Sequence, residues 1–252
     1  MMLPLRLGFL PLVDAAPLII ASAMGFAEEE GLALDLAAAP SWSALRDLLA
    51  QGAVTAAQML APVPVAQALG LAGTARFEVL SVLNLNGNAI GVSTALAARM
   101  KGHDFALTDA LAAGQAMLAA RSDRLRIGVP YAFSMHNELV RYWLECLSDP
   151  PLASVEIVTV PPALMADALA QGEIDAFCVG EPRGSVAVDR GAGVLLLPTS
   201  AIWAAAPEKV LAARRGWAEA EPDAAGRLIR AVWRAGRWLD QRQNQSVASE
   251  IL

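Results

Sequence analysis

Apolar and polar positions alternate along this chain in a pattern that predicts short strands separated by amphipathic helices. Apolar runs predict strands at residues 5–10, 32–36, 54–60, 77–83, 89–93, 125–129, 155–160, 174–179, 194–197 and 208–213. Helical spacing predicts helices at residues 15–31, 43–51, 62–71, 106–120, 135–147, 162–171 and 223–241. Regular alternation of strands and helices is typical of α/β folds with largely parallel sheets.

One eight-residue segment occurs twice with few changes. Residues 49–56 read Leu-Ala-Gln-Gly-Ala-Val-Thr-Ala, and residues 169–176 read Leu-Ala-Gln-Gly-Glu-Ile-Asp-Ala. Each copy ends a helix on a glycine and leads directly into an apolar strand. The repeat indicates two similar α/β halves, although alanine and glycine are common enough here to produce such a match by chance.

The predicted organisation is therefore two lobes with a ligand cleft between them. The polar stretch at residues 84–88, Asn-Leu-Asn-Gly-Asn, is a natural place for the chain to cross into the second lobe. We expect residues 1–90 to form the first part of lobe 1 and residues 91–192 to form lobe 2. Residues 193–252 would return to lobe 1.

Composition narrows the class of protein and its partners. Hydrophobic residues make up 56% of the chain, but the longest apolar run, residues 15–27, is too short to span a bilayer and contains a proline. The positively charged start of a leader would have only Arg6, and Pro11, Asp14 and Pro17 interrupt what would be its apolar region, so we expect no cleaved leader and a cytoplasmic protein. The alternative is a periplasmic protein whose leader was removed. A net charge of −6 without a basic block argues against nucleic acid as a direct partner.

Three loops that follow predicted strands have a polar or small-residue character suited to ligand binding. They lie at residues 11–17, 39–43 and 130–137, and they contain Asp14, Trp42 and His136. In open α/β sheets ligands bind beyond the carboxyl ends of the strands. The helices that begin there present free N–H groups and a partial positive charge, which favour an anion.

Each candidate residue also has a purely structural interpretation. Trp42 would offer an aromatic wall with one indole donor, or a hydrophobic contact beneath a loop. His136 would donate an N–H or carry a positive charge, or else help to hold its helix in place. Asn88 would present an amide to the ligand, or belong only to a tight turn. Glu181 would bind a cation, pair with Arg183, or cap the next helix.

Nothing in the sequence indicates catalysis, a cofactor or a metal. There is no glycine-rich phosphate loop, serine elbow or convincing pair of acid and base carboxylates. The two cysteines, Cys146 and Cys178, lack CxxC spacing, and the only other histidine is His103, so no zinc site or disulfide framework is expected.

Seven motifs taken in order resemble one known family. They are Gly-Phe-Leu-Pro-Leu at 8–12, Ser-Trp-Ser-Ala-Leu-Arg-Asp at 41–47, Gln-Met-Leu-Ala-Pro at 58–62, Asn-Leu-Asn-Gly-Asn-Ala-Ile at 84–90, Ser-Met-His-Asn at 134–137, Gly-Glu-Pro at 180–182 and Thr-Ser-Ala-Ile-Trp at 199–203. The chain is similar to the nitrate- and bicarbonate-binding proteins of ABC transporters, which have the periplasmic binding protein type II fold. Within them it most resembles the leaderless NasS-type nitrate/nitrite sensors.

The resemblance implies a set of binding residues. In nitrate-transport relatives a tryptophan, a glutamine, a histidine and a lysine hold the anion, and by motif these fall on Trp42, Asn88, His136 and Ser200. Serine in place of the lysine would remove a formal charge, and charge-assisted hydrogen bonds are about twice as strong as neutral ones. Arg46 or Arg183 would be candidates to compensate. The family also usually continues past the position of Leu252.

The resemblance further implies a function. We expect a cytoplasmic sensor that binds nitrate or nitrite and thereby releases an RNA-binding antitermination regulator. One alternative is the solute-binding component of a nitrate, bicarbonate or sulfonate ABC transporter, with the permease as its partner. The other is an enzyme similar to thiamine-pyrimidine synthases, but this chain lacks the cysteine-rich motif of those enzymes. We therefore predict a binding protein and no enzyme.

Overall fold

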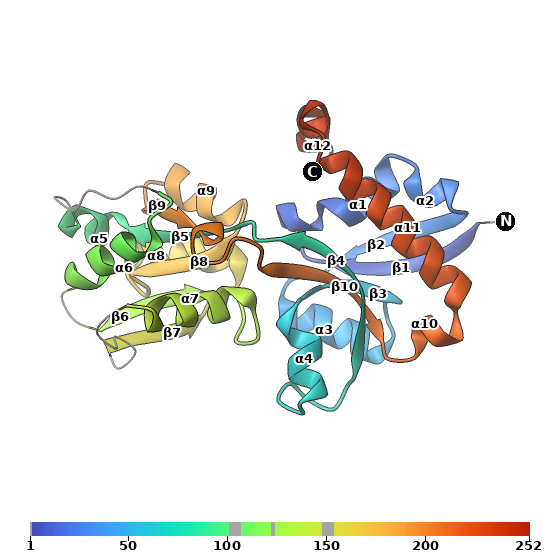
Figure 1. The fold of residues 1–252 in the computed structure, drawn as a ribbon, viewed down its shortest axis with the longest axis horizontal. Coiled ribbons are helices and arrows are strands. Elements are labelled where there is room, and N and C mark those ends of the chain that lie inside the picture. The colour runs from blue at the N-terminus through green and yellow to red at the C-terminus, as the bar shows by residue number, and fades with distance from the viewer. Residues whose placement is uncertain (1, 101–106, 122–123, 148–153) are drawn as a thin grey trace. The chain divides into compact units, whose positions relative to one another are not determined.

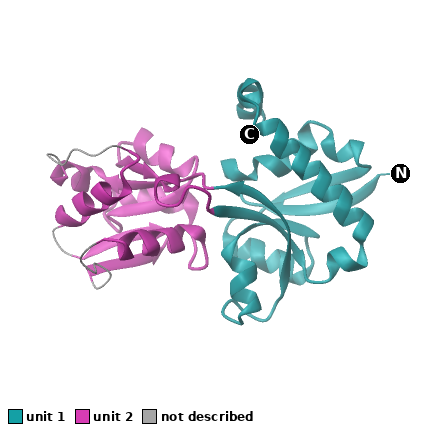
Figure 2. Ribbon diagram, in the orientation of Figure 1, with its two compact units in different colours: residues 1–85, 207–252 teal, residues 86–206 magenta. Residues whose placement is uncertain are grey.

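The computed structural model describes residues 2–100, 107–121, 124–147 and 154–252. The chain divides into two compact units, and each has its own sheet (Figures 1 and 2). Unit 1 comprises residues 1–85 and 207–252, and unit 2 comprises residues 86–206. The first crossover falls within the polar stretch at 84–88, where the sequence predicts it.

Unit 1 is built on a five-stranded mixed sheet. Its strands are β1 (Leu3–Phe9), β2 (Leu32–Ala38), β3 (Ala56–Leu60), β4 (Phe77–Leu85) and β10 (Pro207–Arg214). Their order is β2-β1-β3-β10-β4. Strand β1 runs parallel to β2 and β3, whereas β10 runs antiparallel to β3 and β4. The start of β10 therefore lies at the edge of the sheet where β1, β2 and β3 end.

Helices cover this sheet and complete its core. They are η1 (Val13–Ala15), α1 (Ala16–Ala23), α2 (Phe26–Glu29), α3 (Trp42–Gln51), α4 (Pro62–Ala68), α10 (Trp217–Ala220), α11 (Pro222–Leu239), η5 (Arg242–Asn244) and α12 (Gln245–Ile251). Leu18 and Ile20 of α1 pack with Leu228 and Val232 of α11 in one buried cluster.

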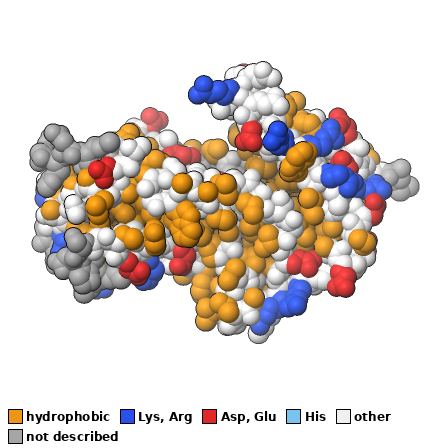
Figure 3. Space-filling view, in the orientation of Figure 1, with side chains coloured by type: hydrophobic (Ala, Val, Ile, Leu, Met, Phe, Trp, Pro, Cys, Tyr) orange, Lys and Arg blue, Asp and Glu red, His pale blue; other side chains and the backbone are white. Residues whose placement is uncertain are grey.

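Two details of unit 1 refine the predicted helices. The single helix expected at 15–31 is two helices, because Gly25 adopts a left-handed conformation (φ 76°) before α2 begins. The solvated face of α11 carries arginines that form ion pairs with α2 and the residue after it: Arg230 binds Glu30 at 2.8 Å, and Arg234 binds Glu29. Figure 3 shows basic and acidic side chains intermingled over α11.

Unit 2 repeats the arrangement of the first sheet. Its strands are β5 (Asn88–Ser93), β6 (Leu125–Val129), β7 (Val155–Thr159), β8 (Ala176–Gly180) and β9 (Gly193–Pro198). Their order is β7-β6-β8-β5-β9. Strand β6 runs parallel to β7 and β8, and β5 runs antiparallel to β8 and β9. The same sequence of parallel and antiparallel neighbours occurs in unit 1, which confirms the prediction of two similar halves.

The helices of unit 2 cover its sheet. They are α5 (Thr94–Arg99), α6 (Ala110–Ala119), α7 (Met135–Glu145), η3 (Pro162–Leu164), α8 (Met165–Ala170), α9 (Arg183–Asp189) and η4 (Thr199–Ala201). One buried cluster includes Ile127, Val140 and Leu144, and a second includes Met165 and Phe177. The predicted helix at 106–120 is α6 in its described part, and His103 lies outside the described residues.

The two copies of the repeated eight-residue segment occupy equivalent positions in the two units. In each unit a glycine with positive φ, Gly52 (75°) or Gly172 (70°), follows a helix and precedes a strand. These strands are β3 and β8, the third strand in the order of each sheet. Val54 and Ile174 lie two residues after the glycines and are buried. The repeat therefore reflects a shared helix–turn–strand unit.

The return to unit 1 comes later than the predicted residue 193. Strand β9 pairs with β5 from Ala89 to Ser93 and belongs to the sheet of unit 2. The chain re-enters unit 1 at Pro207, where β10 begins. The sequence could not reveal this, because β9 and β10 are both short apolar strands and only their pairing assigns them to different sheets.

Candidate functional site

Polar side chains gather in unit 1 where the parallel strands end. Asp14 lies in η1, which follows β1, and Trp42 is the first residue of α3, which follows β2. Gln58 lies within β3. Lys209 lies near the start of β10 and is paired with Leu60, the last residue of β3. Four separate segments of the chain thus bring these side chains to one edge of the sheet.

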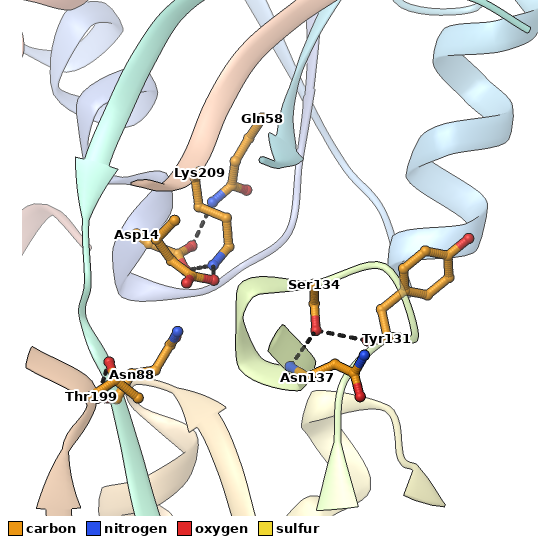
Figure 4. Close-up of polar contacts among 9 residues, drawn as sticks. Asp14, Gln58, Asn88, Tyr131, Ser134, Asn137, Thr199 and Lys209 are labelled. Carbon is orange, nitrogen blue, oxygen red and sulfur yellow. Dashed lines mark hydrogen bonds and ion pairs between the residues drawn. The ribbon is translucent and has the colours of Figure 1, made fainter. Parts of the chain in front are cut away.

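Lys209 is the centre of this group and is fully buried. Its ammonium Nζ lies 2.8 Å from Asp14 Oδ2 and 2.6 Å from Glu208 Oε1. Gln58 Nε2 donates to Asp14 Oδ1 at 2.5 Å, and Gln58 Oε1 accepts from the main-chain N–H of Leu10 at 2.9 Å. Figure 4 shows Lys209 and Gln58 converging on Asp14. Each of these buried polar groups is held in place by another.

The charge of Lys209 is retained in spite of its burial. Burial lowers the pKa of Lys209, but the attraction and hydrogen bonds of Asp14 and Glu208 outweigh it, so that the pKa is raised. Lys209 thus lies between two carboxylates that are fully or almost fully buried. The sequence gives a signal for it, because Pro-Glu-Lys opens an otherwise apolar strand at residues 207–209.

Trp42 lies against the same ammonium. Its ring centroid is 5.4 Å from Lys209 Nζ, a cation–π distance. Only 2% of Trp42 is exposed, and its indole Nε1 has no hydrogen-bond partner among the described residues. Ser41 caps α3 by accepting from the main-chain N–H of Ala44, which fixes the start of the helix that carries Trp42. A buried N–H donor without an acceptor is rare in folded proteins and points to a ligand.

Unit 2 places a buried amide at the corresponding edge of its sheet. Asn88 is the first residue of β5 and is paired with Gly180, the last residue of β8. Thr199 Oγ1 donates to the main-chain carbonyl of Asn88 at 3.2 Å, as Figure 4 shows. Only 4% of Asn88 is exposed, and within the described part of the chain neither Nδ2 nor Oδ1 of its side chain has a partner.

His136 lies in the first turn of α7, which follows β6, and it is buried. Ser134 fixes this turn. Its hydroxyl accepts from the main-chain N–H of Asn137 at 3.2 Å and donates to the carbonyl of Tyr131 at 2.7 Å (Figure 4). The Asn137 side chain in turn donates to the carbonyl of Ala132 at 3.0 Å. The loop before α7 is thus pre-organised by its own hydrogen bonds.

The remaining candidates have different surroundings. Glu181 accepts from the main-chain N–H of Ser185 at 3.0 Å, in the first turn of α9. Ser200 is exposed in η4, and its neighbour Thr199 makes the bond to Asn88. Arg46 donates to Asp47. The Nε of Arg183 is buried and lacks a partner in the described ranges.

The structure therefore brings Asp14 and Trp42 together around a lysine that the sequence analysis did not consider. Asn88 and His136 occupy the corresponding edge of the sheet in unit 2. Lys209 is a formal positive charge beside Trp42. Ser200, to which the resemblance assigns the lysine position, lies in η4 of unit 2 and stays a prediction.

Comparison with known proteins now identifies the family. The model of the NMT1-like family matches residues 3–252, which is almost the whole chain. The chain belongs to the NMT1-like family. Among similar members, the nitrate import ATP-binding protein NrtC of Synechococcus elongatus is 36% identical over 98% of this chain. The nitrate/nitrite binding protein NrtA of Nostoc sp. is 32% identical over 98% of this chain.

This NMT1-like chain is shorter than those relatives. It spans 37% of the length of NrtC and 56% of the length of the Nostoc NrtA. The crystal structure of the periplasmic nitrate-binding protein NrtA from Synechocystis superimposes with a TM-score of 0.87 at 31% identity, covering all of this chain and 66% of that one. The fold is thus that of the periplasmic binding proteins, as the resemblance implied.

None of the described helices combines the length and the apolar composition needed to cross a bilayer. The described residues also contain no group of three or more histidine, cysteine, aspartate or glutamate side chains placed to hold a metal ion.

Proposed function

We propose that this chain binds a small oxyanion, nitrate or nitrite, and performs no chemical step on it. The observation that carries the proposal is the buried Trp42 Nε1, a donor without an acceptor beside the buried ammonium of Lys209. Nitrate and nitrite carry only acceptor oxygens and one negative charge. They would accept from the indole and from the ammonium of unit 1.

A titration of the protein with anions tests this proposal. We expect calorimetry to show binding of nitrate or nitrite, with hydrogen carbonate and methanesulfonate as the competing candidates. Trp42→Phe keeps the ring and removes only Nε1, and a hydrogen bond to a charged group contributes about 1.5–3 kcal/mol. The affinity should therefore fall about tenfold or more.

The matched control is Trp233→Phe, because Trp233 lies on α11 with most of its surface exposed. This variant should bind like the wild type. The proposal fails if no anion in the panel binds, or if Trp42→Phe binds the preferred anion as tightly as the wild type does.

We further propose that the chain is a cytoplasmic sensor that controls an antitermination regulator. The support is the resemblance to NasS-type sensors. Mechanistically, nitrate would bind one conformation of the protein better than the conformation that holds the regulator, and so shift the population. Co-purification with the regulator should be lost when nitrate is added. A complex that persists unchanged at saturating nitrate would contradict the sensor role.

The alternative proposal is the solute-binding part of an anion ABC transporter. It is favoured by the names of the relatives, which include a nitrate import ATP-binding protein and a nitrate/nitrite binding protein. Mapping the natural start codon of the gene discriminates the two. An upstream leader or a lipobox cysteine would support transport and exclude the cytoplasmic location.

A further inference from the structure

Gln58 is a polar residue in the middle of a strand that is otherwise apolar. The other four residues of β3 are two alanines, a methionine and a leucine, and the whole strand is buried. Gln58 itself is fully buried. Burying a side-chain amide is costly unless its donor and acceptor atoms both find partners. The contacts of Gln58 therefore indicate why the amide is there.

Both ends of the Gln58 side chain are bonded, and in a fixed order. Its Oε1 accepts from the main-chain N–H of Leu10 at 2.9 Å, and its Nε2 donates to Asp14 Oδ1 at 2.5 Å (Figure 4). A main-chain N–H can only donate and an ionised carboxylate can only accept. Position 58 must therefore offer one acceptor toward Leu10 and one donor toward Asp14, which an amide does at any pH.

The pairing of β3 with β10 places Gln58 on the same face of the sheet as Lys209. Gln58 is paired with Leu211 of β10. Two residues further along both strands, Leu60 is paired with Lys209. Side chains two residues apart on a strand point to the same face, so the amide and the ammonium lie on one side of the sheet.

Asp14 connects the two side chains. Its Oδ1 accepts from Gln58, and its Oδ2 lies 2.8 Å from Lys209 Nζ. Asp14 belongs to η1, a turn of three residues that has no side-chain cap. The bond from Gln58 therefore restrains the rotation of the carboxylate, and the carboxylate restrains the ammonium that lies against the ring of Trp42.

We propose that Gln58 is a positioning residue of the anion site. It fixes the Asp14 carboxylate, which in turn holds the Lys209 ammonium beside the indole of Trp42, where both donors can meet an anion. The inference rests on the proposed function, because it concerns the same site. Gln58 acts through Asp14 and is assigned no contact with the anion. Binding groups held by such supporting hydrogen bonds pay less to become ordered when the ligand arrives.

The first test removes the hydrogen bonds and keeps the length of the side chain. In Gln58→Met the nitrate affinity measured by calorimetry should fall about tenfold. The matched control is Gln67→Met, since Gln67 lies in α4 of the same unit and only 1% of it is exposed. Urea denaturation measures the stability of both variants. A purely structural role of Gln58 predicts a loss of stability with the nitrate affinity of the wild type.

The second test makes the donor depend on pH. In Gln58→Glu a protonated carboxyl offers the same acceptor and the same donor as the amide. The ionised form offers no donor and faces the carboxylate of Asp14. Burial and that carboxylate should raise the pKa of the introduced carboxyl above its ordinary value of about 4.3.

Nitrate affinity is therefore compared with that of the wild type at each pH, so that titration elsewhere, as at His136, cancels. The ratio of Gln58→Glu affinity to wild-type affinity should be near one at about pH 5 and about tenfold lower at about pH 9. The corresponding ratio for Gln67→Glu should not change. The charged side chains of the cluster and of the elements packed on β3 are the same in both variants: Asp14, Glu208, Lys209, Arg6, Arg46, Asp47 and Arg214.

A double-mutant cycle tests whether Gln58 acts through Asp14. Asp14→Ala should weaken nitrate binding, and adding Gln58→Met to it should weaken binding no further, because the carboxylate to be positioned is absent. Losses of affinity that simply add would contradict the proposed route.

The outcomes separate this inference from the proposed function. If the wild type binds no nitrate, the proposed function fails and the inference fails with it. If Trp42→Phe weakens binding but a folded Gln58→Met binds nitrate like the wild type, only the positioning role is wrong. If Gln58→Met lacks the wild-type circular dichroism spectrum, Gln58→Glu decides. A ratio that is the same at both pH values would then overturn the inference.

Discussion

At the scale of single residues, one buried lysine organises the polar edge of unit 1. Lys209 joins Asp14 from the first loop to Glu208 of β10, and it lies over the ring of Trp42. Removing one member of a buried ion group leaves the charges of the others less well compensated, which typically costs about 3–5 kcal/mol. We therefore expect the side chain to matter for stability as well as for the proposed binding.

The variant Lys209→Met tests this role. Its free energy of unfolding in urea should fall by about 3–5 kcal/mol, because two buried carboxylates lose the ammonium that they both contact. The control is Arg6→Met, which breaks the exposed pair with Asp35 and should cost about 1 kcal/mol or less. Equal losses for the two variants would show that the buried group is no more important than a surface ion pair.

The difference in stability between the wild type and Lys209→Met should depend on pH in a predictable direction. The pKa of Lys209 is raised in the folded protein above the ordinary value of 10.5, because the two carboxylates outweigh the effect of burial. The stabilisation is therefore complete below that ordinary value and is lost only as the pH rises through the folded value. The difference in stability between wild type and Lys209→Met should stay constant from neutral pH to about pH 10 and shrink above it.

The sequence predicted some of these residues and missed others for a physical reason. Asp14 and Trp42 follow strands directly, so local order placed them at the ligand edge of the sheet. Lys209 and Gln58 lie inside strands, and what they contact depends on the pairing of β10 with β3, about 150 residues away along the chain. Local patterns carry no information on that pairing. The Ser200 assignment followed motif order alone and could not detect it.

At the scale of elements, capping serines fix the N-termini of helices, including the helix that carries the candidate binding residue His136. Ser134 accepts from the N–H of Asn137 and so begins α7, the helix of His136. Ser93 caps α5 in the same way by accepting from the N–H of Leu96. Ser93 lies at the end of β5, and the candidate binding residue Asn88 lies at its start. Ser93 is therefore a helix cap at the opposite end of the strand from Asn88.

This contrast gives a paired prediction. Ser134→Ala and Ser93→Ala should each lower the free energy of unfolding by about 1 kcal/mol, the usual cost of a lost cap. Only Ser134→Ala should also weaken nitrate binding, because it loosens the turn that positions His136. Urea denaturation and calorimetry of both variants measure the two effects. A nitrate affinity that falls equally in both would indicate a general effect of lost stability.

Most helices and strands were predictable because the spacing of their apolar residues agrees with the positions of the glycine and proline residues near their ends. Apolar runs, most of them bounded by glycine or proline, marked each strand of the described residues within a few residues. The predicted helix bounds were inaccurate where a glycine interrupts an apolar stretch. Gly25 divides the expected helix at 15–31, since its left-handed conformation ends one helix before the next begins.

At the scale of the whole molecule, the chain forms two units with separate cores and the same sheet order. The repeated eight-residue segment predicted this duplication, because both copies form the same helix–turn–strand unit. The point of return to unit 1 was less predictable, because β9 and β10 differ in their partners rather than in their pattern. In both units the candidate binding residues lie where the parallel strands end.

The central claim is that the polar group around Lys209 in unit 1 binds a small oxyanion. Calorimetric titration with nitrate of the wild type and of Trp42→Phe, with Trp233→Phe as the control, tests it most directly. We predict that the wild type binds nitrate and that Trp42→Phe binds it at least about tenfold more weakly. A wild type that binds no nitrate, or a Trp42→Phe variant that binds it as tightly as the wild type, would contradict the account.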